Sequence, residues 1–264
     1  MAVNTRRVAC VGDNCIDRYI GDDQYDLPGG NALNVAVRLD ADYYGAVGDD
    51  DEGRTIVEQA RAAGVGVDGI EVRPGRSGVT LVELDRGERR FVLEEYGVAA
   101  AYRVSADVAA RLAGYRWVHL ARQPDALAFA PGLRGSGVRL SCDFCDEWDS
   151  ELAASLAPHL EVAFFSGDES AAAHAVERGA RIAVATLGDA GSAAHSTSGR
   201  FEQRALPAEI VDTLGAGDAL IAAFIASTLD GGDARDSLRA GAEAAAESCG
   251  YRGAWPLRDR QEAT

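Results

Sequence analysis

The sequence predicts an α/β fold built on a mostly parallel central sheet with helices on both faces. Short apolar runs that suit buried strands alternate with stretches of helical period along almost the whole chain. The first apolar run, Val8–Val11, is followed by Gly12 and Asp13, which puts Asp13 at the carboxyl end of a strand, where open α/β sheets hold their ligands. No linker or low-complexity segment interrupts the 264 residues, so we expect one domain, residues 1–264, with a sizeable core.

The expected strands of the sheet are short and apolar. They are Val8–Val11, Tyr43–Val47, Trp117–Leu120, Val138–Cys142, Val162–Phe165 and Arg181–Thr186. The expected helices are Asn31–Leu39, Gly53–Ala63, Ala106–Leu112, Glu151–Ala157, Glu169–Arg178, the apolar run Ala219–Leu229 and the alanine-rich run Asp233–Glu247.

Two segments depart from this alternation and predict antiparallel pairs of strands. Thr80–Leu84 and Arg89–Leu93 predict a hairpin whose turn is Asp85-Arg86-Gly87-Glu88. Ser192–His195 paired with Arg200–Gln203 would form an antiparallel edge of the main sheet.

Composition and charge exclude several partners and indicate a compartment. The net charge of -16 argues against nucleic acid and anionic membrane as partners. No apolar run reaches membrane-spanning length, and Met1–Arg7 lacks the apolar core of a signal peptide. The 5 cysteines form no even framework of disulfides, which favours a reducing, cytoplasmic location.

All 26 basic residues are arginines, and the chain contains no lysine. This excludes a Walker A lysine, the lysine of protein kinases and any Schiff-base mechanism. Phosphate recognition would therefore rest on backbone amides, metal and arginine. The bias itself is typical of a GC-rich genome or of salt adaptation, and composition does not separate the two.

The most informative segment is Asp212-Thr213-Leu214-Gly215-Ala216-Gly217-Asp218, which precedes an apolar helix. Glycines before a helix let backbone N–H groups converge near the positive end of the helix dipole, so Gly215, Ala216 and Gly217 predict an anion hole. A carboxylate beside bound phosphate is repelled unless it takes the proton of an attacking hydroxyl, which predicts Asp218 as a catalytic base. The alternative is that Asp218 only caps the helix.

A second segment adds groups that suit a sugar. Asp13 ends the first strand, and Gly29-Gly30 precede a helix on which Asn31 and Asn34 lie three residues apart on one face. Carboxylate and amide groups together suit a polyol, because each hydroxyl both donates and accepts hydrogen bonds. The alternative for Asn34 is a buried structural amide. Phosphate hole, acidic base and polyol binder together predict a sugar kinase.

With these motifs in order, the chain resembles the ribokinase-like (PfkB) family of carbohydrate kinases over nearly its whole length. The resemblance rests on Gly29-Gly30-Asn31-Ala32-Leu33-Asn34 and on the Asp212–Asp218 segment. It implies the ribokinase-like three-layer fold, ATP as phosphoryl donor, Mg2+, and a small β-lid made from parts of residues 14–28 and 78–98. Such a lid is often shared between two subunits, so a homodimer is implied as well.

The resemblance also assigns roles to particular residues. It implies that the sugar binds at Asp13, Gly29, Gly30, Asn31 and Asn34. It implies that the nucleotide binds at Thr186, Gly188, Gly191, Asp212 and Thr213. Relatives place a metal-organising acid where this chain has Ser166-Gly167-Asp168-Glu169, which leaves Glu169 as the candidate for magnesium, although Ser166 replaces the usual asparagine.

Within the family, the resemblance is to kinases that phosphorylate fructoselysine and related Amadori compounds at the sugar 6-hydroxyl. It rests on Gly12–Asp17, Val47–Asp51, Cys142–Ser150 and Gly253-Ala254-Trp255. Arg90 and Arg122 are candidates for pairing the carboxylate of the amino-acid tail. The alternative acceptors are a plain ketose such as fructose, ribose, and nucleosides. A further alternative is a non-catalytic regulator that binds a sugar or nucleotide.

Three further patterns are interpreted as structural. Cys142-x-x-Cys145 has no second pair, which favours buried thiols beside the pocket over zinc or redox chemistry. Gly64–Gly69 matches a dinucleotide fingerprint by letter but follows a helix, so a helix stop and turn is expected rather than an oxidoreductase site. His119 is interpreted as a satisfied structural histidine.

Overall fold

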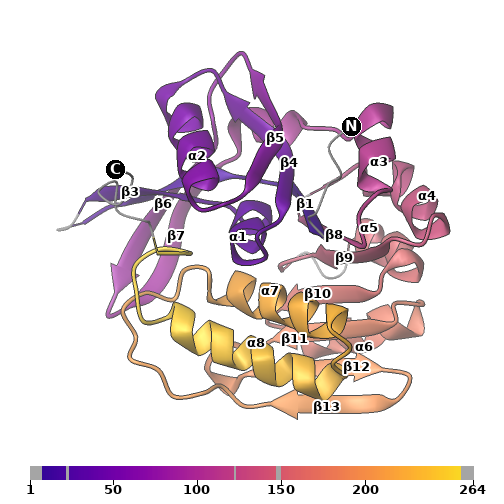
Figure 1. The fold of residues 1–264 in the computed structure, drawn as a ribbon. Coiled ribbons are helices and arrows are strands. Elements are labelled where there is room, and N and C mark those ends of the chain that lie inside the picture. The colour runs from indigo at the N-terminus through magenta and orange to yellow at the C-terminus, as the bar shows by residue number, and fades with distance from the viewer. Residues whose placement is uncertain (1–7, 22–23, 122, 147–149, 257–264) are drawn as a thin grey trace.

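The computed structural model describes residues 8–21, 24–121, 123–146 and 150–256, and its largest feature is a nine-stranded sheet (Figure 1). Its strands are β1 (Val8–Gly12), β4 (Asp42–Gly48), β5 (Gly66–Arg73), β8 (Trp117–Ala121), β9 (Arg139–Asp143), β10 (Val162–Ser166), β11 (Ile182–Thr186), β12 (Ser192–Ser196) and β13 (Gly199–Gln203). Across the sheet the order is β13-β12-β11-β10-β9-β8-β1-β4-β5. Neighbours pair in parallel from β11 to β5, whereas β12 and β13 add an antiparallel edge.

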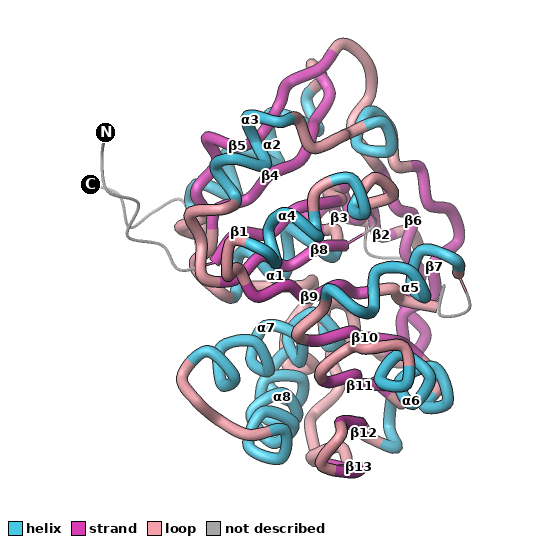
Figure 2. The backbone as a smooth tube through the Cα atoms, turned by 90° about the vertical axis from the view of Figure 1, so that its right-hand side faces the viewer, coloured by secondary structure: helices cyan, strands magenta, loops and turns pink. Residues whose placement is uncertain are grey.

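Two groups of helices cover opposite faces of this sheet, and each group has its own buried cluster. One face carries α1 (Asn31–Arg38), α2 (Asp51–Ala62), α7 (Ala216–Leu229) and α8 (Ala234–Ser248). The other carries α3 (Ala106–Leu112), α4 (Ala130–Gly135), α5 (Glu151–Leu156) and α6 (Glu169–Glu177). Figure 2 shows α7 and α8 on one side of the strands and α5 and α6 on the other. Short 3-10 turns lie at Gly97–Ala101, Ala126–Ala128, Ala157–His159 and Gly188–Ala190.

Strand β10 shows why the strands of a sheet that is buried on both faces have continuously apolar sequences. Successive side chains point to opposite faces, so Phe164 and Phe165 join different clusters. Phe164 meets Phe224 of α7 edge to face with ring centroids 5.6 Å apart. Phe165 stacks on Phe144 at 5.3 Å on the opposite face. Both layers are thus held to one central strand.

The alanine-rich helix α8 packs closely on α7. A Cβ built on Gly241 would lie 2.8 Å from Cγ of Leu220, so only glycine permits this approach. The contact fixes α7, whose first turn carries Asp218.

A second sheet of four strands lies beside the carboxyl ends of the first. Its strands are β2 (Cys15–Tyr19), β3 (Tyr25–Gly29), β6 (Val79–Asp85) and β7 (Glu88–Glu95), in the order β3-β2-β6-β7. We call it the lid sheet. Figure 1 shows β6 and β7 extending away from the main sheet, at the left of the view.

The predicted fold class is confirmed, and every expected strand and helix is present. Most ends differ by one or two residues, while α7 begins three residues before the predicted Ala219, at Ala216. The predicted turn at Gly64–Gly69 is wrong in part, because Gly66 already begins edge strand β5, which pairs in parallel with β4. Strands β2, β3 and β5 and helix α4 were not expected as such. Within the described residues, no helix has the length and apolarity needed to cross a membrane.

Candidate active site

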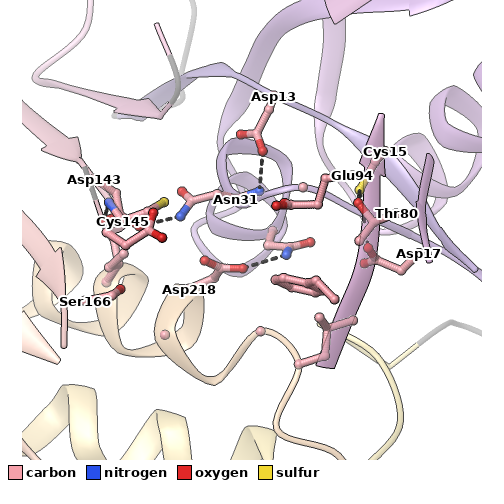
Figure 3. Close-up of a pocket in the computed structure, with 18 of the residues that line it drawn as sticks. Asp13, Cys15, Asp17, Asn31, Thr80, Glu94, Asp143, Cys145, Ser166 and Asp218 are labelled. Atoms are coloured by element: carbon pink, nitrogen blue, oxygen red, sulfur yellow. Dashed lines mark hydrogen bonds between the residues drawn. The ribbon is translucent and has the colours of Figure 1, made fainter. Parts of the chain in front are cut away.

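A cavity of about 340 Å³ lies between the lid sheet and the carboxyl ends of the main strands. Ser166 and Thr186 reach it from the ends of β10 and β11, and Asp143 from the end of β9. The loop after β1, the first turns of α1 and α7, and strands β2, β6 and β7 complete its walls. Figure 3 shows Asp13, Asn31, Asp143 and Asp218 converging on it from these separate elements. This is the place where an open α/β sheet is expected to bind its ligand.

Asp218 is held in the cavity by Asn34. The Nδ2 atom of Asn34 donates to Oδ2 of Asp218 over 2.6 Å, which joins α1 to α7. Burial raises the pKa of Asp218 to about 7, and the neighbouring carboxylates of Asp143 and Asp13 add to the rise. The residue that caps α7 is Gly215, so Asp218 is not the helix cap that the sequence left open as its alternative. A carboxyl group poised near neutral pH in a cavity suits a general base.

The start of α7 offers backbone donors to the cavity. Gly215 has a φ of 77°, and no side chain caps the helix. Gly215 and Gly217 line the cavity, and a Cβ built on Gly217 would meet nothing within 4 Å, so protein packing does not require glycine there. Ala216 is placed differently, because its N–H donates to the carbonyl of Thr213 at 3.3 Å. The open space at Gly217 is what an incoming anion needs.

Asp212 holds the loop before α7 rather than facing the cavity. It is fully buried and accepts hydrogen bonds from the hydroxyl of Tyr19 at 2.5 Å and from the N–H groups of Leu214 and Gly253 at 2.9 Å each. Its carboxylate therefore ties together β2 of the lid sheet, the loop before α7 and the segment that contains Gly253. The structure does not bring Asp212 into the cavity.

Thr213 joins the same loop to the lid hairpin. Its N–H donates to the carbonyl of Gly87 at 3.0 Å, and its hydroxyl accepts from the N–H of Arg89 at 3.2 Å. The turn between β6 and β7 is thus bonded to the segment that leads into α7. Asp212 and Thr213 are not among the residues that line the cavity, and their assignment to nucleotide binding stays a prediction.

The side chain of Asp13, from the loop after β1, lies at the start of α1. Its carboxylate accepts from the N–H groups of Asn31 at 3.2 Å and Ala32 at 3.1 Å. Nδ2 of Asn31 in turn donates to Asp143 at 2.5 Å, and the buried Oδ1 atoms of Asn31 and Asn34 have no protein partner. A bound hydroxyl could donate to each of those oxygens.

Gly29 and Gly30 are needed by the protein's own packing. A Cβ on Gly29 would lie 1.8 Å from Oδ2 of Asp17, and one on Gly30, whose φ is +102°, would lie 2.5 Å from the Cα of Asn14. Both glycines therefore let the chain pass close to β2. Gly30 also lines the cavity, whereas Gly29 does not.

Asp17 and Asp143 line the cavity and were not predicted as site residues. Asp17 is buried on β2, accepts from the thiol of Cys15 at 3.3 Å, and has its pKa raised to about 7 by burial. Burial also raises the pKa of Asp143. Their signal in the sequence was weak: Asp17 lies four residues after Asp13, and its inward position depends on β2 being a strand.

The predicted nucleotide loop lies between β11 and β12. Thr186 lines the cavity, and its hydroxyl donates to the carbonyl of Phe165 at 3.3 Å. A Cβ on Gly188, whose φ is +60°, would meet nothing within 4 Å, whereas one on Gly191 would lie 2.1 Å from the carbonyl oxygen of Gln203. Gly188 thus leaves open space beside the loop, and Gly191 is required by the contact with the end of β13.

Glu169 is not among the residues that line the cavity, and its carboxylate already has partners. Oε1 accepts from Nε2 of His195 at 2.8 Å, and both oxygens pair with the guanidinium of Arg200. The hydrogen bond from Arg200 is the main reason that its pKa is lowered to about 2. Among the described residues, no group of three or more His, Cys, Asp or Glu side chains could hold a metal ion. The metal role of Glu169 stays a prediction that this pairing disfavours.

A β-bulge decides which lid residues face the cavity. In the pairing of β6 with β7, Leu81 lies opposite Leu93 and Val82 opposite Phe91, so the register shifts by one residue between them. Without the bulge, alternate residues of β7 would line the cavity along its whole length. With the bulge, Arg89 and Phe91 at the tip of the hairpin lie on the same face as Glu94 and Tyr96 at its base. All four of these residues line the cavity.

Two arginines, Arg90 and Arg122, were predicted to pair with the carboxylate of the substrate's amino-acid tail. Arg90 lies on the outer side of the hairpin, with its side chain 77% exposed and 3.8 Å from Glu83, so it does not line the cavity. Arg122 lies outside the described residues. Arg89, the neighbour of Arg90, reaches the cavity instead, with its guanidinium 4.6 Å from the ring centroid of Phe91.

His119, Cys142 and Cys145 were interpreted as structural residues. His119 is fully buried, its Nδ1 lies 2.9 Å from the hydroxyl of Ser141, and burial lowers its pKa to about 3. The prediction of a satisfied histidine is wrong in part, because its Nε2 is buried without a hydrogen-bond partner among the described residues. Cys142 is buried and Cys145 lines the cavity. All five cysteines are free thiols.

A family model described as pfkB family carbohydrate kinase matches residues 7–139 and 150–259. The chain is 35% identical to fructoselysine 6-kinase of Shigella flexneri over 263 residues, which cover 95% of this chain and 100% of that protein. It is 32% identical to a fructosamine kinase of Bacillus subtilis, covering 94% and 93% of the two chains.

The solved structures agree on the fold. A structure of Arabidopsis thaliana ribokinase, complexed with ribose and ATP, superposes with a TM-score of 0.81 at 23% identity, over 94% of each chain. At 23% identity the likeness shows the fold alone, which is the ribokinase-like α/β fold.

Proposed function

The chain belongs to the pfkB family of carbohydrate kinases, and from that premise we propose that it transfers the γ-phosphate of ATP to the 6-hydroxyl of an Amadori compound, fructoselysine or a close relative. The observation that carries the kinase chemistry is Asp218, held by Asn34 at 2.6 Å at the start of α7 with a pKa of about 7. The acceptor is supported by the two relatives named for fructoselysine and fructosamine.

Asp218 would act as the general base. Its carboxylate would take the proton of the 6-hydroxyl as that oxygen attacks the γ-phosphorus and the bond from phosphorus to the bridging oxygen of ADP breaks. The hydrogen bond from Asn34 would keep the carboxylate aimed at the hydroxyl. The N–H groups at the start of α7, with the space beside Gly217, would stabilise charge on the transferring group.

The sugar would lie between α1 and the lid sheet. Asn31 and Asn34 each present a buried Oδ1 without a protein partner, which a hydroxyl could satisfy. Asp13 and Gly30 line the same wall, and Asp17 and Asp143 add two further acceptors. Burying a hydroxyl against several such groups orients it as well as binding it.

ATP would enter beside the loop of Thr186, Gly188 and Gly191, next to the start of α7. Magnesium binds few carboxylates together with phosphate oxygens and water. The described residues offer no three-ligand cluster, so the nucleotide phosphates would supply most of its coordination. Glu169, paired with Arg200, does not fit this role without losing that partner.

The lid sheet would close over the sugar and join two subunits in a homodimer. Every residue of β7 is exposed, and Val92 and Leu93 are 44% and 46% exposed on this edge strand. An exposed apolar edge strand is a ready site for pairing with another chain. A cytoplasmic location accords with the five free thiols.

Plain ketoses are the second candidate class of acceptor, because the residues proposed to hold the ring would also fit fructose. ATP consumption across a panel of fructoselysine, fructose, ribose and nucleosides separates the possibilities. We expect kcat/KM for fructoselysine to exceed that for fructose at least tenfold, or about 1.4 kcal/mol. A smaller preference would mean that the tail is not recognised, and no turnover of any acceptor would favour a non-catalytic binding protein.

A further inference from the structure

Acidic side chains outnumber basic ones among the described residues that line the cavity. Among the described residues that line it, the only basic side chain is Arg89, whereas six are carboxylic acids: Asp13, Asp17, Glu94, Asp143, Asp146 and Asp218. A cation near several carboxylates is favoured by Coulomb attraction, most strongly where water is partly excluded. The charge balance therefore favours an acceptor that itself carries a positive group.

Arg89, the one arginine among the described residues that line the cavity, lies at the end where α7 begins. The backbone of Arg89 is bonded to Thr213, in the segment leading into α7. Its charge lowers the pKa of both Asp17 and Asp218, in opposition to the rise caused by burial. It is thus placed to meet the negative charge of a phosphate rather than that of a distant tail.

Glu94 lies at the other end of the same row of lid residues. Glu94 follows Arg89 by about five residues of strand, and the bulge takes up one of them. The distance between the two residues along the strand is therefore roughly 13 Å. Figure 3 shows the Glu94 carboxylate on the side of Asn31 and Asp13, apart from Asp218. The hydroxyl of Tyr96 donates to Oε1 of Glu94 at 3.1 Å and so orients it.

The bulge in β7 is what turns Glu94 inward. Thr80, which lies opposite Glu94, lines the cavity, and Val82, which lies opposite Phe91, is fully buried. A regular β7 would have placed Leu93 in line with Phe91 and turned Glu94 away. The strand thus departs from regular pairing at the point where it presents an acid to the far end of the cavity.

We propose that Glu94 recognises the secondary ammonium group that an Amadori compound carries on its first carbon. This proposal rests on the function proposed above. With the 6-hydroxyl at Asp218, the first carbon lies at the opposite end of the sugar, toward Glu94 and Asp13. Glu94 is then a specificity-determining residue that separates a sugar amine from the plain ketose, while the groups around Asp218 carry out the transfer common to both.

The test compares two acceptors that differ only in the charged atom. One is 1-butylamino-1-deoxyfructose, a secondary amine, and the other is 1-O-butylfructose, its uncharged ether. We expect the wild-type protein to prefer the amine at least tenfold in kcat/KM, mainly through KM, and Glu94→Gln to reduce that preference to about onefold. Glu94→Asp should restore part of it, because the charge is kept on a shorter side chain.

Glu95→Gln is the matched control, because Glu95 lies opposite Val79 on the outer side of the hairpin and does not line the cavity. It should keep the wild-type preference. Equal use of amine and ether by the wild-type protein, or a preference retained by a folded Glu94→Gln variant, would overturn the role of Glu94 while leaving the kinase assignment intact. Failure of the wild-type protein to phosphorylate either compound or fructoselysine would instead overturn the proposed acceptor class.

Discussion

The side chain of Asn34 on α1 donates a hydrogen bond of 2.6 Å to Asp218 on α7, and this bond joins two segments 184 residues apart in the chain. The bond holds the amide of Asn34, from the segment expected to bind the sugar, against the carboxylate of Asp218, which is expected to accept a proton from the sugar hydroxyl. The two motifs that suggested a sugar kinase are therefore parts of one site.

Replacing Asp218 by asparagine should abolish most turnover without unfolding the protein. The amide keeps the size of the side chain and can still bond to Asn34, but it cannot accept a proton at the working pH. Loss of a general base costs about 10²–10⁴ in rate. Steady-state kcat with unchanged melting temperature and ATP binding would show this, with the exposed Asp236→Asn as control. A variant that keeps more than a tenth of wild-type kcat would exclude Asp218 as the base.

The rate should follow the ionisation of Asp218. Because its pKa is raised to about 7, the carboxylate is largely protonated at pH 6 and largely ionised at pH 8. We expect kcat to rise with pH through about 7 and then to level off. A kcat that stays flat between pH 5.5 and 8.5 would contradict this assignment.

Two glycines two residues apart should respond differently to valine. In Gly217→Val the new side chain enters open space beside the start of α7, so KM for ATP should rise while the melting temperature changes little. In Gly215→Val the φ of 77° and the Cα of Ala254 at 2.6 Å should cause marked destabilisation. An unchanged KM for ATP in folded Gly217→Val would remove the anion hole from the account.

Asp17 should make the ligand-free protein less stable as pH rises. Its pKa is about 7 in the folded state and about 3.9 when unfolded, so between these values the native state holds more protons than the unfolded state. The stability present below pH 4 is lost as pH rises through 7. Asp17→Asn does not titrate, so its melting temperature should gain on that of the wild type between pH 5 and pH 8. A constant difference across that range would show that Asp17 is not perturbed.

The lid sheet is predicted to hold two subunits together. Leu93→Asp places a charge on the exposed edge strand β7 without touching the cavity face, so it should shift a dimeric mass toward that of the monomer. Light scattering at micromolar concentration measures this directly. A strictly monomeric wild-type protein would refute the prediction.

The main sheet could be predicted from sequence because its strands are buried on both faces and therefore apolar throughout, as in β10. The strands that were missed lack that signal. Strand β5 is a half-buried edge strand that contains Gly66 and Gly69, and β2 carries charged residues at Asp17 and Arg18. Their pairing depends on neighbours far away in the chain.

For the site as well, the residues with a local sequence signal could be predicted and those that depend on distant neighbours could not. Residues within glycine-rich motifs before helices could be identified locally, and Asp218, Asn31 and Asn34 indeed line one cavity. The orientation of the lid residues could not be identified in this way, because regular alternation places Phe91 and Leu93 on the same face, whereas the β-bulge puts them on opposite faces. Glu169 was assigned from position alone, and its pairing with Arg200 depends on β13, a strand 31 residues further along.

The most direct test of the central claim is the position of the phosphate in the product. Purified protein is incubated with ATP, Mg2+ and fructoselysine, ADP is measured, and the product is examined by carbon and phosphorus NMR. We expect one ADP for each phosphorylated sugar and phosphorus coupling at C6 and C5. Phosphate on any other carbon, or no ADP above the reaction without acceptor, would contradict it.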